Sequence, residues 1–178
     1  MLSANNIFLI GPMGSGKSAV GRHLARLFHF TFHDSDVDIE ARTGVDIPFI
    51  FEKEGEAGFR LRERESIERL TLLESVVLAT GGGAVIDPHN RQLLAARGVV
   101  VYLSTSIEQQ IERTRHGRNR PLLNGTDPEQ KLTELMLFRA GLYAEIADFT
   151  VSTDSRRVQL VAEEIQAKIV QARTATFV

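Results

Sequence analysis

The stretch "GPMGSGKS", Gly11 to Ser18, places three glycines around a lysine and a serine, directly after the apolar run "NIFLI". It matches the pattern G-x-x-x-x-G-K-[ST] in full. Glycine loses more conformational freedom on folding than any other residue, so this density of glycine needs a reason. A chain of phosphates provides one, because it lies against bare backbone whose successive N–H groups point at it. With an expected strand before it and a helix after it, the stretch predicts a phosphate-binding loop.

Each residue type in this loop has a chemical task. Gly11, Gly14 and Gly16 would keep the backbone bare. Lys17 would place a charge on the β- and γ-phosphates, and Ser18 would offer its hydroxyl to Mg²⁺. A glycine-rich turn that only joins strand to helix is the alternative, and the flanking pattern argues against it. The residues expected to bind the nucleotide are consecutive: Gly14, Ser15, Gly16, Lys17, Ser18 and Ala19.

Apolar, β-prone runs alternate with longer stretches of helical periodicity along the chain. The five expected strands are Ile7–Ile10, Thr31–His33, Val76–Ala79, Val99–Leu103 and Phe149–Ser152. Short strands that are apolar on both faces and are separated by helices predict a parallel sheet covered on both sides. The expected fold is therefore α/β, a three-layer α/β/α domain with a five-stranded parallel sheet.

Helical periodicity is strongest in the stretches 17–28, 56–74, 106–115, 127–146 and 155–172. The length of 178 residues suits one domain, residues 1–178. Two segments interrupt the alternation and are expected to carry binding elements. They are a substrate-binding insertion at about residues 34–73, with two or three helical pieces, and an arginine-rich lid at about residues 114–126.

The composition limits the class of protein. Hydrophobic residues make up 43% of the chain and the formal net charge is −2, so nothing suggests nucleic-acid binding. Cysteine is absent, which excludes disulfides and thiolate–metal sites. The N-terminal "MLSANN" has no basic region, and the apolar run after it is too short for a signal peptide or a membrane span. These features favour a cytoplasmic enzyme.

Two carboxylates follow the second expected strand, in the stretch "HDSD". Asp34 and Asp36 would lie at the carboxyl end of a parallel strand, where ligands bind in open α/β sheets. One could hold a magnesium-bound water, and the other could hydrogen-bond to an acceptor hydroxyl and take its proton. An N-cap pair for the helix "VDIEAR" explains the same residues equally well. The fourth strand ends without an aspartate, so Asp34 is the better candidate for the metal.

Three consecutive glycines, Gly81, Gly82 and Gly83, follow the third strand. They would let a ligand approach the backbone closely and could supply N–H donors, while a plain flexible turn is the alternative.

Three arginines are placed where they could meet a ligand: Arg60 in the first insertion, Arg120 in the lid segment and Arg139 on the helix after it. Each one alone is more readily a solvated surface residue. Two arginines that face one pocket would suit a carboxylate. The crowding of arginines between residues 113 and 120 would supply the positive charge that phosphoryl transfer needs.

Five motifs occur together in the order and spacing of shikimate kinases: "GPMGSGKS", "DSDVDIE", "IFEKEGEAGFRLRE", "ATGGGAV" and "RPLL". The first and the fourth are common singly, but the five together are specific. The chain resembles this family from Asn6 to about Ile169. The resemblance implies a nucleoside-monophosphate-kinase-like fold. It also implies transfer of the γ-phosphoryl group of ATP to the 3-hydroxyl of shikimate, in aromatic amino-acid biosynthesis.

The resemblance also implies roles for the residues of the nucleotide side. Lys17 and Ser18 would hold ATP and Mg²⁺, and Asp34 would reach the metal through water. Arg120 would reach the transferring phosphate, and Arg113 would lie near the adenine.

On the acceptor side, the resemblance makes Asp36 the ligand of the shikimate hydroxyls and the candidate base. Arg60 and Arg139 would clamp the carboxylate, and Glu63 would orient Arg60. Backbone N–H groups of Gly81–Gly83 would line the site. The residues expected to act in catalysis are Lys17, Asp36 and Arg120.

Two positions depart from the family pattern: Ala19, where threonine is common, and Gly141, where proline is usual. Gly141 should loosen the chain just after Arg139.

Two other functions compete with this interpretation. The first is another small-acceptor kinase with the same phosphate loop, for gluconate or for a nucleotide. The "DSD" carboxylates would repel the phosphates of a second nucleotide. A gluconate kinase is not expected to carry "DSDVDIE" together with "ATGGGAV". A nucleotide-dependent switch should show an N-K-x-D guanine motif, which the sequence lacks. A monomer is expected, with no nucleic-acid or membrane partner.

Overall fold

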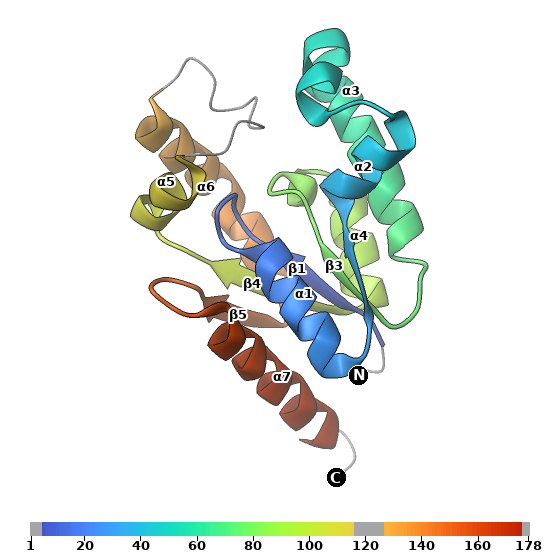
Figure 1. Cartoon of the computed structure of the whole chain (residues 1–178), viewed down its shortest axis with the longest axis vertical. Coiled ribbons are helices and arrows are strands. Elements are labelled where there is room, and N and C mark those ends of the chain that lie inside the picture. The colour runs from blue at the N-terminus through green and yellow to red at the C-terminus, as the bar shows by residue number, and fades with distance from the viewer. Residues whose placement is uncertain (1–4, 116–126, 176–178) are drawn as a thin grey trace.

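A five-stranded sheet forms the centre of the molecule (Figure 1). The computed structural model describes residues 5–115 and 127–175. The strands are β1 (Ile7–Ile10), β2 (Thr31–Asp34), β3 (Val76–Ala79), β4 (Val99–Ser104) and β5 (Phe149–Ser152). They lie in the order β2-β3-β1-β4-β5 and pair in parallel throughout. The predicted parallel sheet is confirmed, with every strand end within one residue of the expected position.

Helices cover both faces of the sheet, because its side chains are apolar on both faces. Alternate residues of β1 belong to two separate cores, Ile7 and Leu9 to one and Phe8 and Ile10 to the other. The first core lies beneath α1 (Lys17–Phe28) and α7 (Val158–Ala175). The second lies beneath three helices: α3 (Ile47–Leu70), α4 (Pro88–Arg97) and α6 (Pro128–Ile146). The three-layer α/β/α architecture is therefore confirmed.

The chain between β2 and β3 forms the expected insertion. It consists of α2 (Ser35–Thr43) and α3, and it has a small core of its own, formed by Ile39, Ile50 and Phe59. Gly55, with φ of +69°, interrupts α3, so the insertion holds three helical pieces, as the sequence suggested.

Some helix boundaries differ from the prediction. The helix expected from residue 56 is the second half of α3, which begins at Ile47 and ends at Leu70. Helix α4 was not expected, although Asp87 caps it and Pro88 opens it. Two shorter elements complete the described chain, the 3-10 turn η1 (Ala84–Ile86) and α5 (Ile107–Thr114). None of the helices in the described ranges is long and apolar enough to cross a membrane.

Candidate active site

The loop between β1 and α1 has a backbone shape that glycine allows. Gly11, Gly14 and Gly16 have φ values of +140°, +77° and +86°, which residues with a side chain rarely adopt. A Cβ at Gly11 would collide with the carbonyl oxygen of Leu103, and one at Gly14 would lie 3.2 Å from the Cα of Gln110. The loop is therefore pressed against β4 and α5, and Gly16 leads directly into the N-terminus of α1.

Lys17 lies inside this loop. Its ammonium donates to the carbonyl oxygens of Gly11 and Pro12, both at 2.8 Å, and only 9% of the residue is exposed. The loop thus holds a positive charge next to the N-terminus of α1, whose unpaired N–H groups also favour an anion. Loop, lysine and helix together suit phosphate groups.

Ser18 and Asp34 join the phosphate loop to the end of β2. The Ser18 hydroxyl donates to Asp34 Oδ2 at 2.6 Å. The other carboxylate oxygen of Asp34 accepts from the backbone N–H of Asp36 at 3.0 Å and caps α2, so the N-cap interpretation of Asp34 is confirmed. A hydroxyl and a carboxylate in contact are oxygen ligands that suit Mg²⁺, which binds few protein groups and completes its shell with water and phosphate. The residues present therefore fit a magnesium ion.

Asp36 lies in the first turn of α2 and is half-buried. Its pKa is raised to about 7, first by burial and then by the negative charges of Asp34 and Glu63, while the charge of Lys17 opposes the shift. Its Oδ1 atom has no hydrogen-bond partner among the described residues. A carboxyl with these properties can accept a hydrogen bond from a hydroxyl group and exchange a proton with it near neutral pH.

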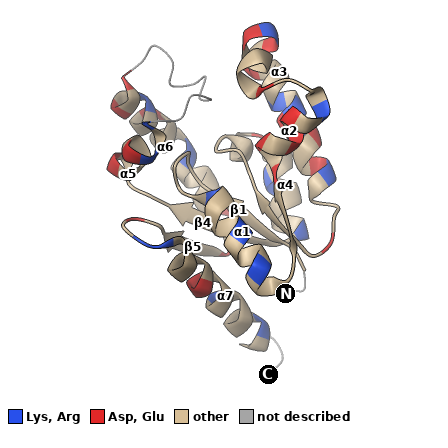
Figure 2. Ribbon diagram, viewed as in Figure 1, with Lys and Arg blue, Asp and Glu red and all other residues tan. Residues whose placement is uncertain are grey.

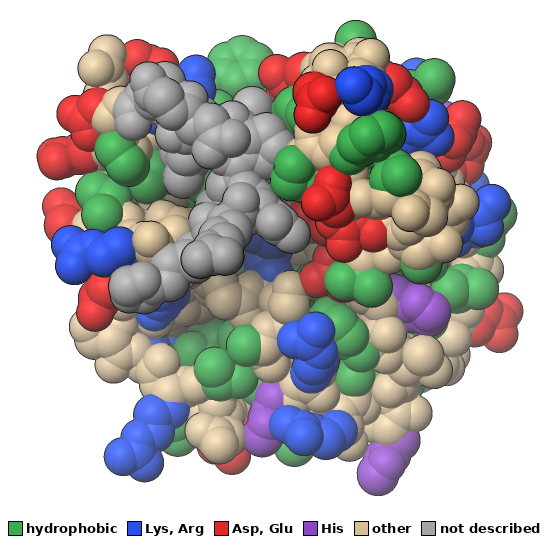
Figure 3. All heavy atoms as spheres, turned by 45° about the horizontal axis from the view of Figure 1, so that its top comes forward, with side chains coloured by type: hydrophobic (Ala, Val, Ile, Leu, Met, Phe, Trp, Pro, Cys, Tyr) green, Lys and Arg blue, Asp and Glu red, His purple; other side chains and the backbone are tan. Residues whose placement is uncertain are grey.

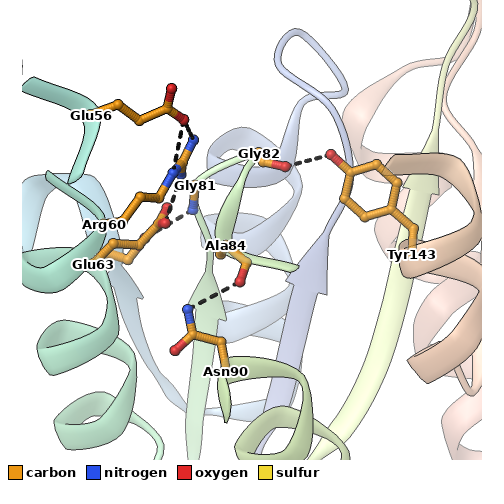
Figure 4. A network of polar contacts seen from close by, with 9 residues as sticks. Glu56, Arg60, Glu63, Gly81, Gly82, Ala84, Asn90 and Tyr143 are labelled. Atoms are coloured by element: carbon orange, nitrogen blue, oxygen red, sulfur yellow. Dashed lines mark hydrogen bonds and ion pairs between the residues drawn. The ribbon is translucent and has the colours of Figure 1, made fainter. Parts of the chain in front are cut away.

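Arg60 lies on α3 between two glutamates (Figure 4). Its Nη1 donates to Glu63 Oε2 at 2.7 Å, while its Nε and Nη2 both donate to Glu56 Oε1, at 3.2 and 2.8 Å. Glu63 is only 1% exposed, and burial raises its pKa although Arg60 opposes the shift. The predicted contact of Glu63 with Arg60 is confirmed.

The three glycines after β3 provide space for charged side chains. A Cβ at Gly81 would lie 2.6 Å from Glu63 Oε1 and 3.0 Å from Asp36 Oδ1, and one at Gly83 would collide with the Arg60 guanidinium. The Gly81 N–H donates to the Ser35 hydroxyl at 2.9 Å. The expectation that Gly81 offers its N–H to a ligand is therefore not met in this structure, because Ser35 already accepts from it. These glycines let the acidic and basic groups of the site approach the loop.

Arg139 lies on α6, 4% exposed, and its Nε has no hydrogen-bond partner among the described residues. Burial lowers its pKa, the nearby charge of Arg60 lowers it further, and the Tyr143 hydroxyl opposes both effects. Two guanidinium groups near enough for one to lower the pKa of the other would suit an anionic group such as a carboxylate.

Arg113 of α5 connects the phosphate loop to the loop after β5. It donates to the carbonyl oxygen of Gly14 at 3.0 Å and to the backbone oxygen of Thr153 at 2.8 Å. Asp154 in turn accepts from the Thr105 hydroxyl at 2.6 Å and from the N–H of Ser106. These contacts order the segment beside the phosphate loop.

Most of the predicted site residues come together at the carboxyl edge of the sheet. They are Lys17, Ser18, Asp34, Asp36, Arg60, Arg139 and the glycines after β3. Arg120 and the lid from residue 116 to 126 lie outside the described residues. Figure 2 shows charged residues concentrated on the helices, densely on α2 and α3. The space-filling view of this end shows a hollow with acidic side chains on its α2–α3 flank (Figure 3).

Sequence reasoning missed two residues of this site. Ser35 accepts from Gly81, and Tyr143 donates to the carbonyl oxygen of Gly82. Ser35 stands within "DSD" and Tyr143 within "RAGLY", so both lie in stretches that the motif analysis had singled out. Their partners, however, are distant in the sequence.

Comparisons with known proteins agree with this geometry. A family model described as shikimate kinase matches residues 13–170. Shikimate kinases from Halorhodospira halophila and Thioalkalivibrio sulfidiphilus are 58% and 55% identical, over 90% and 93% of this chain and 91% and 87% of theirs. The solved structure of shikimate kinase from Acinetobacter baumannii in complex with shikimate is 48% identical, with a TM-score of 0.93 over 96% of both chains.

Proposed function

The chain belongs to the shikimate kinase family. We propose that it transfers the γ-phosphoryl group of ATP to the 3-hydroxyl of shikimate, and we assign roles in this reaction to particular residues. The hydrogen bond between Ser18 and Asp34 carries the assignment. It places the phosphate loop directly beside the turn that bears Asp36, so the donor and acceptor sides adjoin.

The donor side consists of the phosphate loop and its surroundings. Residues Gly14–Ala19 wrap the ATP phosphates with their N–H groups, and Lys17 neutralises charge on the transferring group. Ser18 and Asp34 hold Mg²⁺, which when bound neutralises charge on the phosphates. Arg113 lies toward the adenine, and Arg120 of the lid reaches the transferring phosphate.

The acceptor side consists of α2, α3, α6 and the glycine loop. Arg60 and Arg139 bind the shikimate carboxylate as a pair of planar donors. Asp36 accepts a hydrogen bond from the 3-hydroxyl and aligns its oxygen with the γ-phosphorus. Because the proton of the acceptor leaves late in a loose transition state, this alignment contributes more than removal of the proton does.

The proposed function also suggests the cellular location, the oligomeric state and the partners of the protein. We infer a cytoplasmic monomer whose partner is the small molecule shikimate. The net charge of −2 supports an enzyme that binds neither nucleic acid nor anionic membranes.

An ADP-release assay with three rival acceptors tests the function. Turnover should require added shikimate, and quinate or gluconate at the same concentration should support much less. Equal turnover with gluconate would show a different acceptor specificity. ATP hydrolysis that ignores all three acids would favour a nucleotide-dependent switch.

A further inference from the structure

Tyr143 is fully buried on α6, one helical turn after Arg139. Its hydroxyl donates to the carbonyl oxygen of Gly82 at 2.5 Å (Figure 4). Residues four apart on a helix share one face, so Tyr143 and Arg139 are neighbours on the same face of α6. The pKa values of the two groups reflect this proximity, because each side chain counters part of the shift that burial imposes on the other.

Gly82 in turn lies directly on the phosphate loop. A Cβ there would be 3.3 Å from the backbone nitrogen of Met13 and 3.5 Å from the carbonyl oxygen of Gly11. The Tyr143 hydroxyl thus joins the helix that carries Arg139 to a backbone segment that touches the phosphate loop.

The tyrosine ring has a packing role that is separate from its hydroxyl. The ring stacks on Tyr102 with centroids 5.0 Å apart and an angle of 21° between the planes. Phenylalanine would preserve this stack. The hydroxyl is therefore not needed to fill the core.

We propose that Tyr143 is a positioning residue whose hydroxyl fixes the carboxylate end of the acceptor relative to the phosphate loop. The inference rests on the proposed function, which assigns Arg139 to the shikimate carboxylate. Shikimate is a small rigid ring, so a shift at its carboxylate moves its reacting hydroxyl as well. Tyr143 touches neither reacting atom and acts through Arg139 and Gly82.

Steady-state kinetics of Tyr143→Phe test the proposal. The KM for shikimate should rise, by up to about tenfold, the size expected for loss of one hydrogen bond, while the KM for ATP stays within about twofold. Tyr102→Phe is the matched control, because it removes a tyrosine hydroxyl from the same ring stack. We expect that control to change neither KM by more than about twofold. A rise of both KM values in Tyr143→Phe would overturn the proposal.

Binding of a neutral analogue separates positioning from general loosening of the fold. Shikimate and its methyl ester are titrated into the wild type, Tyr143→Phe, Arg139→Lys and the double variant. The loss of affinity in Tyr143→Phe should be confined to shikimate and should be smaller when Arg139→Lys is already present. Equal losses for acid and ester, or fully additive losses, would make the hydroxyl merely structural. Unchanged shikimate affinity in Arg139→Lys alone would instead contradict the carboxylate clamp of the proposed function.

Discussion

Lys17 is held by carbonyl oxygens of its own loop, so its removal should leave the fold intact. In the proposed mechanism Lys17 faces charge that grows on the transferring phosphoryl group, so its effect should appear in the transition state. In Lys17→Ala we expect kcat to fall by about 10²–10³ with little change in the KM for shikimate. Steady-state rates and circular dichroism would check this. Near-normal turnover in a folded variant would refute the phosphate-loop assignment.

The raised pKa of Asp36 predicts a pH dependence of the reaction. In the proposed mechanism the carboxylate form of Asp36 accepts the hydrogen bond of the shikimate hydroxyl, so kcat/KM for shikimate should rise with pH up to about 7 and then level off. In Asp36→Asn this rise should disappear, with measurable turnover retained and shikimate affinity reduced. A kcat loss beyond about 10⁴-fold with unchanged affinity would instead identify Asp36 as a base first.

Substitutions of Arg60 test whether the acceptor carboxylate is bound by the paired N–H donors of the guanidinium group or by positive charge alone. Arg60→Lys keeps the charge but loses the paired donors, and Arg60→Ala loses both. Shikimate binding should weaken moderately in the first and by about 2–5 kcal/mol in the second, with ATP affinity nearly unchanged. Calorimetric titration of each ligand separately would show the difference. Equal losses for both ligands would indicate that Arg60 only maintains the structure.

At the scale of elements, α6 carries a glycine at an exposed interior position. Gly141 lies between Arg139 and Tyr143, and a Cβ there would meet no atom within 4 Å. Gly141→Ala should therefore stabilise the protein by about 0.5–1 kcal/mol, because the unfolded chain loses conformational freedom. Chemical denaturation would measure this. The KM for shikimate should not increase, since the helical backbone is already compatible with alanine.

Gly44 is the matched control for Gly141. A Cβ at Gly44 would likewise meet no atom within 4 Å, but the φ of this residue is +72° at the end of α2. Gly44→Ala should therefore destabilise the protein, as expected for a side chain forced into the left-handed region. If the two substitutions changed the free energy of unfolding in the same direction, backbone conformation would not be the cause.

The elements that could be predicted from the sequence carry strong local signals. The strands are apolar on both faces, and Asp127 with Pro128 marks the start of α6. The same pair of signals, Asp87 with Pro88, precedes α4, but the polar "PHNRQ" after it conceals the helical pattern. The first half of α3 was expected only as an unbounded helical piece of the insertion, because Gly55 breaks the periodicity of the helix.

At the scale of the whole molecule, Asp36 should lower stability above neutral pH. Its pKa is higher in the folded than in the unfolded chain, so the folded state binds more protons between about pH 4 and 7. The contribution of Asp36 to the free energy of unfolding therefore falls as pH rises through that window. Asp36→Asn should be more stable than the wild type at pH 8, by about 1–3 kcal/mol, with the difference shrinking toward pH 4. Urea denaturation at both pH values would measure this.

Asp38 on the same helix is the control, because its pKa is shifted in the opposite direction. Burial alone would raise its pKa, but hydrogen bonds from Arg69 and Ser66 outweigh this and lower it. Its stabilising contribution is thus present at neutral pH and lost as pH falls, so Asp38→Asn should destabilise the protein at pH 8. Stabilisation by both substitutions would mean that removal of negative charge in general, not the burial of Asp36, is responsible.

Long-range contacts account for the parts of the site that sequence reasoning could not reach. The phosphate loop and the aspartates after β2 were recognisable because their chemistry is local. Ser35 pairs with Gly81 and Tyr143 with Gly82, and only the assembled sheet brings these segments together. Likewise, the space that Gly83 leaves for Arg60 depends on where α3 packs.

The contact between Glu56 and Arg60 has a consequence for selectivity. Glu56 occupies the Nε and Nη2 edge of the guanidinium, so any incoming carboxylate must displace it there. Glu56 lies one helical turn from Arg60 and would compete with an incoming carboxylate for the guanidinium group. Because both residues belong to one chain, its effective concentration is about millimolar or above. An organic acid that reaches Arg60 alone would exchange one ion pair for another and so gain little. In the proposed carboxylate clamp, an acid whose shape also engages Arg139 would gain a second cation, so the site would select among anions by their geometry.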